Sequence, residues 1–133
     1  MQGEISASSA KNSVINLIAA ALLADEPVTL LNVPHLRDVS TMIELLGHMG
    51  VVVVINERMQ VDIHANSISS LKAPYDLVKT MRASFYVLGP LLARFGAVKV
   101  SLPGGCAWGP RPVDFHLKGL KKLGAKITLE RGY

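Results

Sequence analysis

The sequence predicts an α/β (α+β) protein built from repeated units with the element order βαβαββ. Strand-like and helix-like patterns alternate along the 133 residues, and the same order begins again after about residue 64. Equivalent residues of the two rounds lie 69 positions apart early in the unit, as for Leu22 and Leu91, and 74 positions apart later, as for Gly50 and Gly124. We therefore divide the chain into a first unit, residues 1–64, and a second, incomplete unit, residues 65–133, both part of one domain.

The first unit is expected to contain two helices of different character. The first helix is apolar nearly all round and should be buried, whereas the second is amphipathic, with Asp38 as its N-cap and Gly50 as the glycine that ends it. Two apolar runs around Asn56 and Glu57 predict a hairpin. In order, the expected elements are a strand at 4–8, a helix at 12–24, a strand at 28–33, a helix at 38–49, and hairpin strands at 51–55 and 59–63.

The second unit repeats this order, and its closing strand is expected to begin only where the sequence stops. Its first helix is again apolar nearly all round and contains Gly89 and Pro90, which should bend it. Its second helix is amphipathic. In order, the expected elements are a strand at 69–73, a helix at 79–95, a strand at 97–102, a helix at 113–123 and a strand at 126–130.

The change of spacing from 69 to 74 marks a five-residue insertion in the second unit. From Pro34 to Val39 the first unit advances five residues, whereas the equivalent step from Pro103 to Val113 takes ten. A loop added to a repeated scaffold is a common place for function, and neutral drift of loop length is the alternative.

The inserted loop contains the only cysteine of the chain, Cys106. Three nearby glycines let the backbone approach a ligand closely. Arg111 follows five residues later, and Pro112 suits the first position of a helix. A helix start and a guanidinium both attract anions and favour the thiolate form of a nearby cysteine. These features predict a reactive cysteine beside an anion-binding site, with a buried inert thiol as the alternative.

Composition bounds the class of protein. Half of the residues are apolar and the mean hydropathy is +0.34, which predicts a surface covered by another domain or subunit. No apolar run approaches the roughly 20 residues of a membrane span. The first four residues lack the basic start of a signal peptide, and one cysteine cannot form an internal disulfide. We therefore expect a cytoplasmic protein with no membrane association.

The net charge of +4 arises entirely after the inserted loop. Residues 111–133 carry six basic and two acidic side chains, and the preceding residues are balanced. A solvated helix face explains Lys118, Lys121 and Lys122. Nucleic-acid binding would need a broader basic stripe with interleaved aromatic residues, which here make up 5% of the chain. We expect no nucleic-acid partner.

Several stretches resemble the enolpyruvyl transferases closely, and the resemblance covers essentially the whole chain. They are Gly3-Glu4, Ala10-Lys11-Asn12 and residues 73–84, 88–96, 102–106 and 111–114. Family members that use UDP-N-acetylglucosamine are the most similar, because the sister enzymes of aromatic amino-acid synthesis share the fold but lack the cysteine loop. The resemblance implies an inside-out α/β barrel with three such units in each of two domains, of which about two units are present here.

The resemblance also implies an activity. Family members of this kind transfer enolpyruvate from phosphoenolpyruvate to the 3′-hydroxyl of UDP-N-acetylglucosamine and release phosphate, which is the first committed step of peptidoglycan synthesis. No metal or organic cofactor is implied. Cys106 matches the cysteine that acts as general acid at phosphoenolpyruvate, can attack it covalently and is alkylated by the antibiotic fosfomycin.

Further residues match the family's binding positions. The resemblance implies that Lys11, Asn12 and Arg111 bind phosphoenolpyruvate. The residues implied to contact the sugar nucleotide are Asn12, Arg82, Arg111, Pro112, Val113, Asp114 and Phe115. His116 is expected to be a packing or supporting group.

Some of these residues have simpler interpretations. From the residues alone, Lys11 could be solvated, Asp114 could be a first-turn helix carboxylate, and Arg82 needs either a ligand or a buried carboxylate as partner. Three positions depart from the family pattern without removing a named chemical group: Ser9, Tyr86 and Trp108.

The family's active site lies between its two domains. A carboxylate general base and a further arginine come from the part that this sequence lacks, so we expect residues 1–133 alone to be inactive and to need the missing second domain as a partner. A UDP-sugar-binding fragment without catalysis is one alternative. An interaction or nucleic-acid module is another, and self-association of the fragment stays open.

Overall fold

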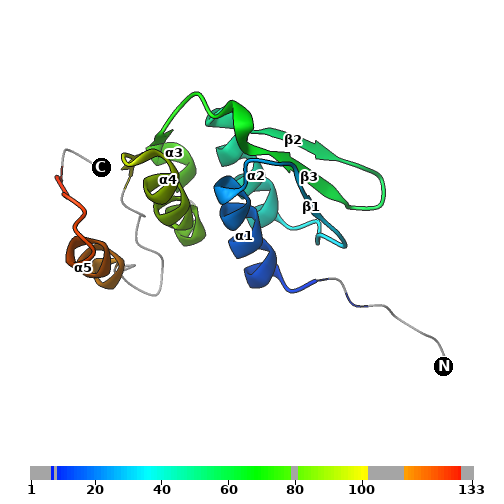
Figure 1. The fold of residues 1–133 in the computed structure, drawn as a ribbon. Coiled ribbons are helices and arrows are strands. Elements are labelled where there is room, and N and C mark those ends of the chain that lie inside the picture. Colours follow the sequence, from blue (N-terminus) through cyan, green and yellow to red (C-terminus); the bar gives the residue numbers. More distant parts are fainter. Residues whose placement is uncertain (1–6, 8, 79–80, 102–112, 130–133) are drawn as a thin grey trace.

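The computed structural model of the chain describes residues 7, 9–78, 81–101 and 113–129 (Figure 1). A three-stranded sheet with two helices beside it occupies one end of the molecule, a second group of helices lies next to these, and the last helix lies at the other end. Helices and strands are mixed along the chain, as the sequence predicts. Within the described residues the sheets have three and two strands, and neither closes into a barrel.

The first unit contains a helix pair and an antiparallel sheet. In chain order its elements are α1 (Lys11–Ala20), the 3-10 helix η1 (Ala21–Leu23), β1 (Val28–Leu30), α2 (Arg37–His48), β2 (Val52–Ile55) and β3 (Val61–His64). The predicted hairpin is confirmed as β2 and β3. β1 pairs with the other edge of β3, which gives the antiparallel order β1-β3-β2.

β3 lies at the centre of this sheet, and its side chains alternate between the two faces. Val61 and Ile63 are fully buried, whereas Asp62 is half-buried on the opposite face. Such alternation is typical of an antiparallel sheet with one face on the core. Met42 and Leu46 of α2 are fully buried in the same cluster.

Two matched glycines end the amphipathic helices of the two units in the same way. Gly50 after α2 and Gly124 after α5 (Asp114–Lys122) have φ values of +90° and +97°. The N–H of the residue after each glycine donates to the carbonyl five positions earlier, at 3.1 Å and 3.0 Å. This is the Schellman motif, which favours glycine at the left-handed position. The predicted end of α2 at Gly50 is therefore confirmed, and the spacing of 74 residues corresponds to the same backbone turn.

The start of α2 differs from the prediction. Its N-cap is Leu36, which has no side-chain capping bond, and Asp38 is the second helical residue. The prediction that Asp38 is the N-cap is therefore wrong by two positions. A carboxylate within the first turn is still favoured by the helix dipole.

The second unit is shorter in its strands and more broken in its helices. After the 3-10 helix η2 (Ala65–Ser67), its elements are β4 (Lys72–Ala73), α3 (Tyr75–Val78), the 3-10 helix η3 (Arg82–Val87), α4 (Leu88–Phe95), β5 (Lys99–Val100) and α5. β4 and β5 pair in parallel, with Ala73 opposite Val100, and the helices form the crossover between them.

The single bent helix predicted at residues 79–95 is wrong. Helical structure already starts at Tyr75, and the α-helical part that contains Gly89 and Pro90 begins only at Leu88. Pro90 therefore lies in the first turn of α4, where its missing N–H has no intrahelical acceptor to lose. The proline helps to start a new helix after η3 and does not bend an existing one.

The remaining strand predictions have mixed outcomes. The strands expected at 28–33 and 97–102 are present but shorter. Residues 126–129 form no strand, so the strand expected at 126–130 is not found in its described part. The strand expected at 4–8 lies, except for Ala7, outside the described residues.

The two inner helical segments lie side by side and point the same way. α1 packs against η3, and η1 packs against α4, so the segments run parallel from their starts to their ends. Ile18, Leu22, Val87 and Leu91 from these segments are fully buried in one core. In the described residues, no helix is long and apolar enough to span a membrane.

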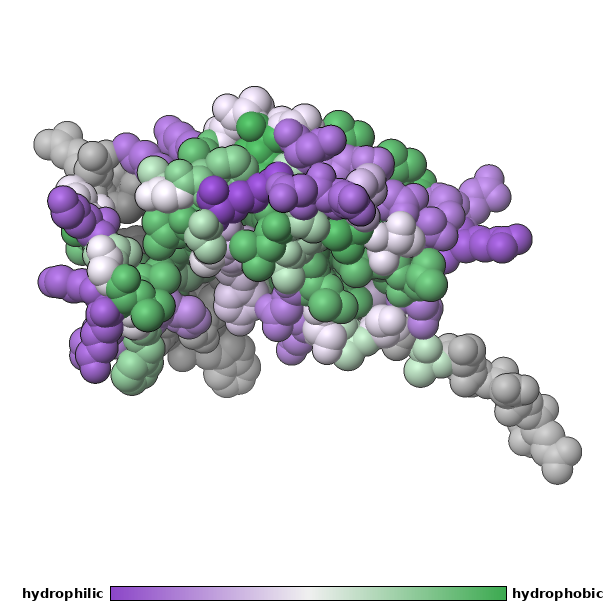
Figure 2. All heavy atoms as spheres, in the orientation of Figure 1, coloured by the Kyte–Doolittle hydropathy of each residue, from purple (hydrophilic) through white to green (hydrophobic). Residues whose placement is uncertain are grey.

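Apolar side chains also reach the surface. Leu17 and Leu23 of the first inner segment are 52% and 53% exposed, and Figure 2 shows apolar patches among the charged side chains on one face of the molecule. These exposed apolar side chains agree with the high apolar content of the chain. That another domain or subunit covers them stays a prediction.

Candidate functional site

The candidate site begins at the start of α1, where Lys11 and Asn12 are the first two helical residues. Both side chains are exposed, and the N-cap Ala10 makes no side-chain capping bond. The free N–H groups of the first turn make this end of α1 electropositive, and Lys11 adds a full charge. The structure therefore places two of the predicted ligands at an accessible, positively polarised helix end.

Lys11 has one strong partner. Its Nζ donates a hydrogen bond of 2.7 Å to Oδ2 of Asp38 in the first turn of α2. The two side chains are 43% and 37% exposed, so the ion pair lies at the surface and is open to solvent. Sequence reasoning treated Asp38 as a cap and missed this contact. The available signal was an acid and a lysine at the starts of two consecutive helices.

Arg82 is the first residue of η3, and η3 packs against α1. Because the two inner segments run parallel, the backbone of Arg82 lies at the same end of the helix pair as Lys11 and Asn12. The prediction for its side chain lies outside what the structure describes. The fold thus brings together the starts of the two inner segments, which are about 70 residues apart in sequence.

The start of α5 lies beside η3. The ring of His116 contacts Phe85 edge-on, with centroids 5.9 Å apart, and is tilted against Tyr86 at 6.5 Å. This is the packing role expected of His116. Val113, just before the helix, is buried. The contact between His116 and Phe85 therefore places the first turn of α5 beside η3, about one helical turn after Arg82 along η3.

Asp114 and Phe115 are accessible at this helix start. Asp114 is the first residue of α5 and is exposed, and Phe115 is 80% exposed. A shallow apolar groove of about 320 Å³ is lined by residues from η3, the start of α4, and α5 with its end. Its lining includes Phe85, Tyr86, Leu88, Phe115, His116 and Leu123. Of the predicted nucleotide contacts at positions 113–115, Phe115 lines this groove, whereas Asp114 precedes it on the same turn and Val113 is buried.

The inserted loop connects two fixed points. Ser101 is buried after β5 and its hydroxyl donates to the carbonyl of Ala73, while buried Val113 precedes α5. The loop therefore leaves the carboxyl end of a parallel strand, which is where open α/β sheets bind ligands. The predictions for Cys106, Arg111 and Pro112 fall between these points and lie outside the described residues.

A second hollow lies between α4, β5, α5 and residues 125–129, with a volume of about 310 Å³. Its lining is mostly apolar and includes Leu92, Val98 and Leu120 together with the methylene-rich side chain of Lys126. In the described part of the chain, no group of three or more His, Cys, Asp or Glu residues could hold a metal ion.

The chain matches a solved structure over nearly all of its length and a family model over all of it. It resembles the crystal structure of the enolpyruvyl transferase NikO from Streptomyces tendae, with 23% identity, a TM-score of 0.82 and 98% of the chain covered. The predicted α+β fold of this class is thereby confirmed. The chain spans 28% of the length of that protein. The family model for EPSP synthase (3-phosphoshikimate 1-carboxyvinyltransferase) matches residues 1–133. The chain therefore belongs to the EPSP synthase family of enolpyruvyl transferases.

Proposed function

We propose that the protein containing this chain transfers enolpyruvate from phosphoenolpyruvate to the 3′-hydroxyl of UDP-N-acetylglucosamine and releases phosphate. Family membership supports an enzyme of the enolpyruvyl transferase type. The observation that carries the finer proposal is the inserted loop with Cys106, which departs from buried Ser101 at the carboxyl end of β5 and returns at buried Val113. The resemblance stated above implies that the sister enzymes that act on a shikimate phosphate lack a cysteine loop of this kind.

The proposed chemistry assigns each group a task. Cys106 delivers a proton to the methylene carbon of phosphoenolpyruvate while the sugar oxygen forms a bond to its central carbon and gives up its hydroxyl proton to the carboxylate base expected from outside this chain. The Cys106 thiolate then takes a proton back from the new methyl group, and the bond from the central carbon to the phosphate oxygen breaks, so that inorganic phosphate leaves. Lys11 and Arg111 bind the anionic groups of phosphoenolpyruvate, and Asn12 lies between the two substrates.

The nucleotide half of the substrate is assigned to the start of α5. Phe115 is exposed beside the apolar groove, and Asp114 precedes it on the first turn. An exposed phenyl ring next to aromatic walls suits a planar base. We assign the uridine end of the substrate to residues 111–115 and assign Arg82, the first residue of η3, as a further contact of the same molecule.

The decisive experiment offers two acceptors to a family-length protein that contains this chain. Phosphate release from phosphoenolpyruvate is measured with UDP-N-acetylglucosamine and, separately, with shikimate 3-phosphate. We expect turnover only with the UDP-sugar, with loss in Cys106→Ser and alkylation of Cys106 by fosfomycin detected by mass spectrometry. Turnover only with shikimate 3-phosphate would overturn the substrate assignment while leaving the family assignment intact.

A matched pair of variants distinguishes loss of the Arg111 contact with the ligand from loss of a positive charge elsewhere on the protein. Arg111→Ala removes a proposed ligand contact, whereas Lys118→Ala removes the same charge from an exposed position of α5. We expect Arg111→Ala to raise the KM for phosphoenolpyruvate at least tenfold, because a charge-assisted bidentate contact is lost, and Lys118→Ala to change it less than twofold. Equal effects of the two variants would contradict the assignment of Arg111.

We propose further that residues 1–133 alone do not turn over, since the remaining catalytic groups come from outside this stretch. Purified 1–133 should release no phosphate from the two substrates, and ordinary turnover would refute the proposal. Binding of UDP-N-acetylglucosamine without turnover, detected by calorimetry and weakened in Arg82→Ala, would identify the chain as a sugar-nucleotide-binding fragment. A cytoplasmic location and a role in peptidoglycan synthesis follow from the proposed reaction.

A further inference from the structure

We propose that Asp38 is a positioning residue that holds the Lys11 ammonium in place for phosphoenolpyruvate. The inference rests on the proposed function, because it takes Lys11 as a ligand of that substrate. The observation that supports this role is the 2.7 Å hydrogen bond from Lys11 Nζ to Asp38 Oδ2, which joins two helices across 27 residues of sequence.

Both partners are held by the first turn of a helix on the common core. Lys11 is the first residue of α1 and Asp38 the second residue of α2. One turn beyond Lys11, Val14 is 4% exposed, and next to Asp38, Val39 is 3% exposed. α1 and α2 pack against each other, so the two backbones cannot separate without opening the core. The carboxylate is therefore a fixed point toward which the flexible lysine side chain is drawn.

The electrostatics favour this arrangement. A lysine at the first position of a helix is repelled by the positive end of the dipole, whereas a carboxylate in the first turn is stabilised there. Asp38 thus supplies the counter-charge that Lys11 lacks on its own helix. A lysine ammonium has three N–H donors, and the contact with Asp38 uses one of them. Two donors remain for the oxygens of an anionic ligand, and the 43% exposure of the side chain leaves them accessible.

Two effects of Asp38 on an anion have opposite signs. Its charge repels the ligand, while its hydrogen bond holds the lysine in position. The pair is more than a third exposed, so solvent weakens the repulsion over the distance from Asp38 to a ligand beyond Lys11. The hydrogen bond from Lys11 to Asp38 acts over only 2.7 Å, so solvent weakens it less than the longer-range repulsion between Asp38 and the ligand. We therefore expect the positioning effect to exceed the repulsion.

The first test is a double-mutant cycle in a family-length protein containing this chain. We expect Asp38→Ala to raise the KM for phosphoenolpyruvate about tenfold and Asp38→Asn about threefold, because the amide oxygen still accepts the hydrogen bond. The KM for UDP-N-acetylglucosamine should change less than twofold. In a Lys11→Ala background, Asp38→Ala should have no further effect, because non-additivity marks residues that act through each other. Glu44→Gln, which removes an exposed carboxylate from the same helix α2, is the control and should change neither KM.

Additive effects of Lys11→Ala and Asp38→Ala would overturn the proposal. So would a lower KM for phosphoenolpyruvate in Asp38→Ala, because that result would make Asp38 a repelling charge only. A second readout does not depend on catalysis. The Lys11 amine is acylated with acetic anhydride and quantified by mass spectrometry, with and without phosphoenolpyruvate. We expect phosphoenolpyruvate to protect Lys11 from acylation in the wild type and in Glu44→Gln. In Asp38→Ala this protection should be lost.

The two readouts also separate this proposal from the proposed function. Protection of Lys11 that depends on Asp38, in a protein that does not use UDP-N-acetylglucosamine, would uphold the positioning role and reject the acceptor. Turnover with UDP-N-acetylglucosamine that is insensitive to Asp38→Ala would uphold the acceptor and reject the positioning role of Asp38. Absence of protection in the wild type would overturn the role of Lys11 and, with it, that of Asp38.

Discussion

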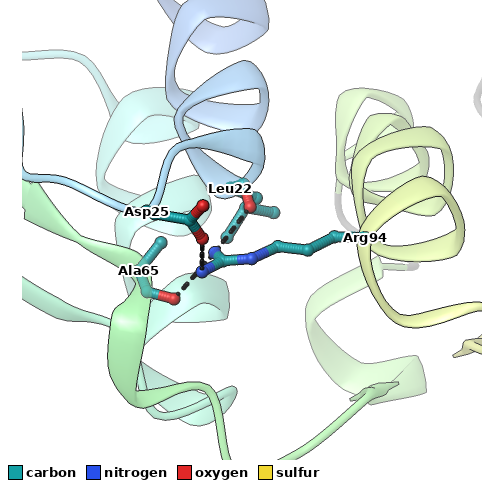
Figure 3. A network of polar contacts seen from close by, with 4 residues as sticks. All are labelled: Leu22, Asp25, Ala65 and Arg94. Carbon is teal, nitrogen blue, oxygen red and sulfur yellow. Dashed lines mark hydrogen bonds and ion pairs between the residues drawn. The ribbon is translucent and has the colours of Figure 1, made fainter.

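Arg94 binds Asp25, and these two residues occupy equivalent positions in the two units. Arg94 Nη2 donates to Asp25 Oδ1 at 2.8 Å, across the spacing of 69 residues that also separates Leu22 from Leu91. Arg94 Nη1 donates to the carbonyls of Leu22 and Ala65, both at 2.9 Å (Figure 3). The end of the second inner helix is thereby tied to the end of the first, where the last carbonyls of η1 lack intrahelical donors.

Replacing Arg94 should destabilise the fold much more than replacing Asp25. Arg94 is 18% exposed, and its loss leaves two carbonyls without their donor, so Arg94→Ala should lower the free energy of unfolding by about 2–3 kcal/mol. Asp25 is 91% exposed, so Asp25→Ala should cost no more than about 0.5 kcal/mol. Arg94→Lys should recover only part of the loss, because an ammonium cannot reproduce the fork. Urea unfolding decides this, and equal midpoints for Arg94→Ala and Asp25→Ala would contradict it.

The elements that sequence reasoning predicted well carry their signal locally. The hairpin around Asn56 and the glycine end of α2 follow from a few neighbouring residues, and both are confirmed. The start of α4 was missed because Pro90 was interpreted as a bend within one long helix, whereas η3 precedes it. Nothing local distinguishes a proline that bends a helix from one in a first turn.

The residues of the candidate site stay a prediction, and their contacts could not be predicted from the sequence. The lysine at the start of α1 is visible in sequence, yet its pairing with Asp38 depends on how α1 packs against α2. The network of Arg94 depends in the same way on the parallel packing of two inner helices. Only the equal spacing of Asp25 and Arg94 in the repeat could have hinted at their contact.

Gly50 and Gly47 give a matched test of backbone conformation at the end of α2. Gly50 has φ of +90°, and an added Cβ would lie 2.5 Å from Ser69 Oγ and 2.8 Å from the carbonyl oxygen of Ser67. Gly50→Ala should therefore lower the free energy of unfolding by about 2 kcal/mol or more. Gly47 lies in the helix with open space around it, so Gly47→Ala should raise stability by about 0.5–1 kcal/mol. Thermal unfolding of both variants checks the opposite signs, and a stabilised Gly50→Ala would be inconsistent with the left-handed turn.

Asp62 should titrate below the usual range of an aspartate. The Thr29 hydroxyl, which donates to Oδ1 at 2.6 Å, and the Gln60 amide hold the pKa of the Asp62 carboxyl below its usual value of 3.8. Thr29→Val should raise the Asp62 pKa back toward that value, as followed by carboxyl carbon chemical shifts in an NMR titration. Thr128→Val, an exposed threonine outside the sheet, should leave it unchanged.

The sign of the linked stability follows from this direction. A carboxyl with a lowered pKa in the folded state stabilises that state above its unfolded pKa, and the contribution is lost as the pH falls through the folded pKa. The stability difference between wild type and Thr29→Val should therefore be largest near neutral pH and should shrink in the acid range below about 3.8. A difference that grows on acidification would contradict the contact.

Phe85 and Phe115 both line the apolar groove, and replacing each of them separates effects on stability from effects on ligand binding. Phe85 is 4% exposed and contacts His116, so Phe85→Ala should cost about 3–5 kcal/mol of unfolding free energy. Phe115 is 80% exposed, and Phe115→Ala should change stability by less than about 0.5 kcal/mol. Under the proposed function, however, Phe115→Ala should raise the KM for UDP-N-acetylglucosamine several-fold without changing the KM for phosphoenolpyruvate. Leu31→Ala, which removes a 68% exposed apolar side chain that does not line the groove, is the control for loss of exposed apolar surface. Equal kinetic constants for wild type, Phe115→Ala and Leu31→Ala would show that the groove does not take the nucleotide, because the exposed Phe115 ring would then contribute nothing to binding.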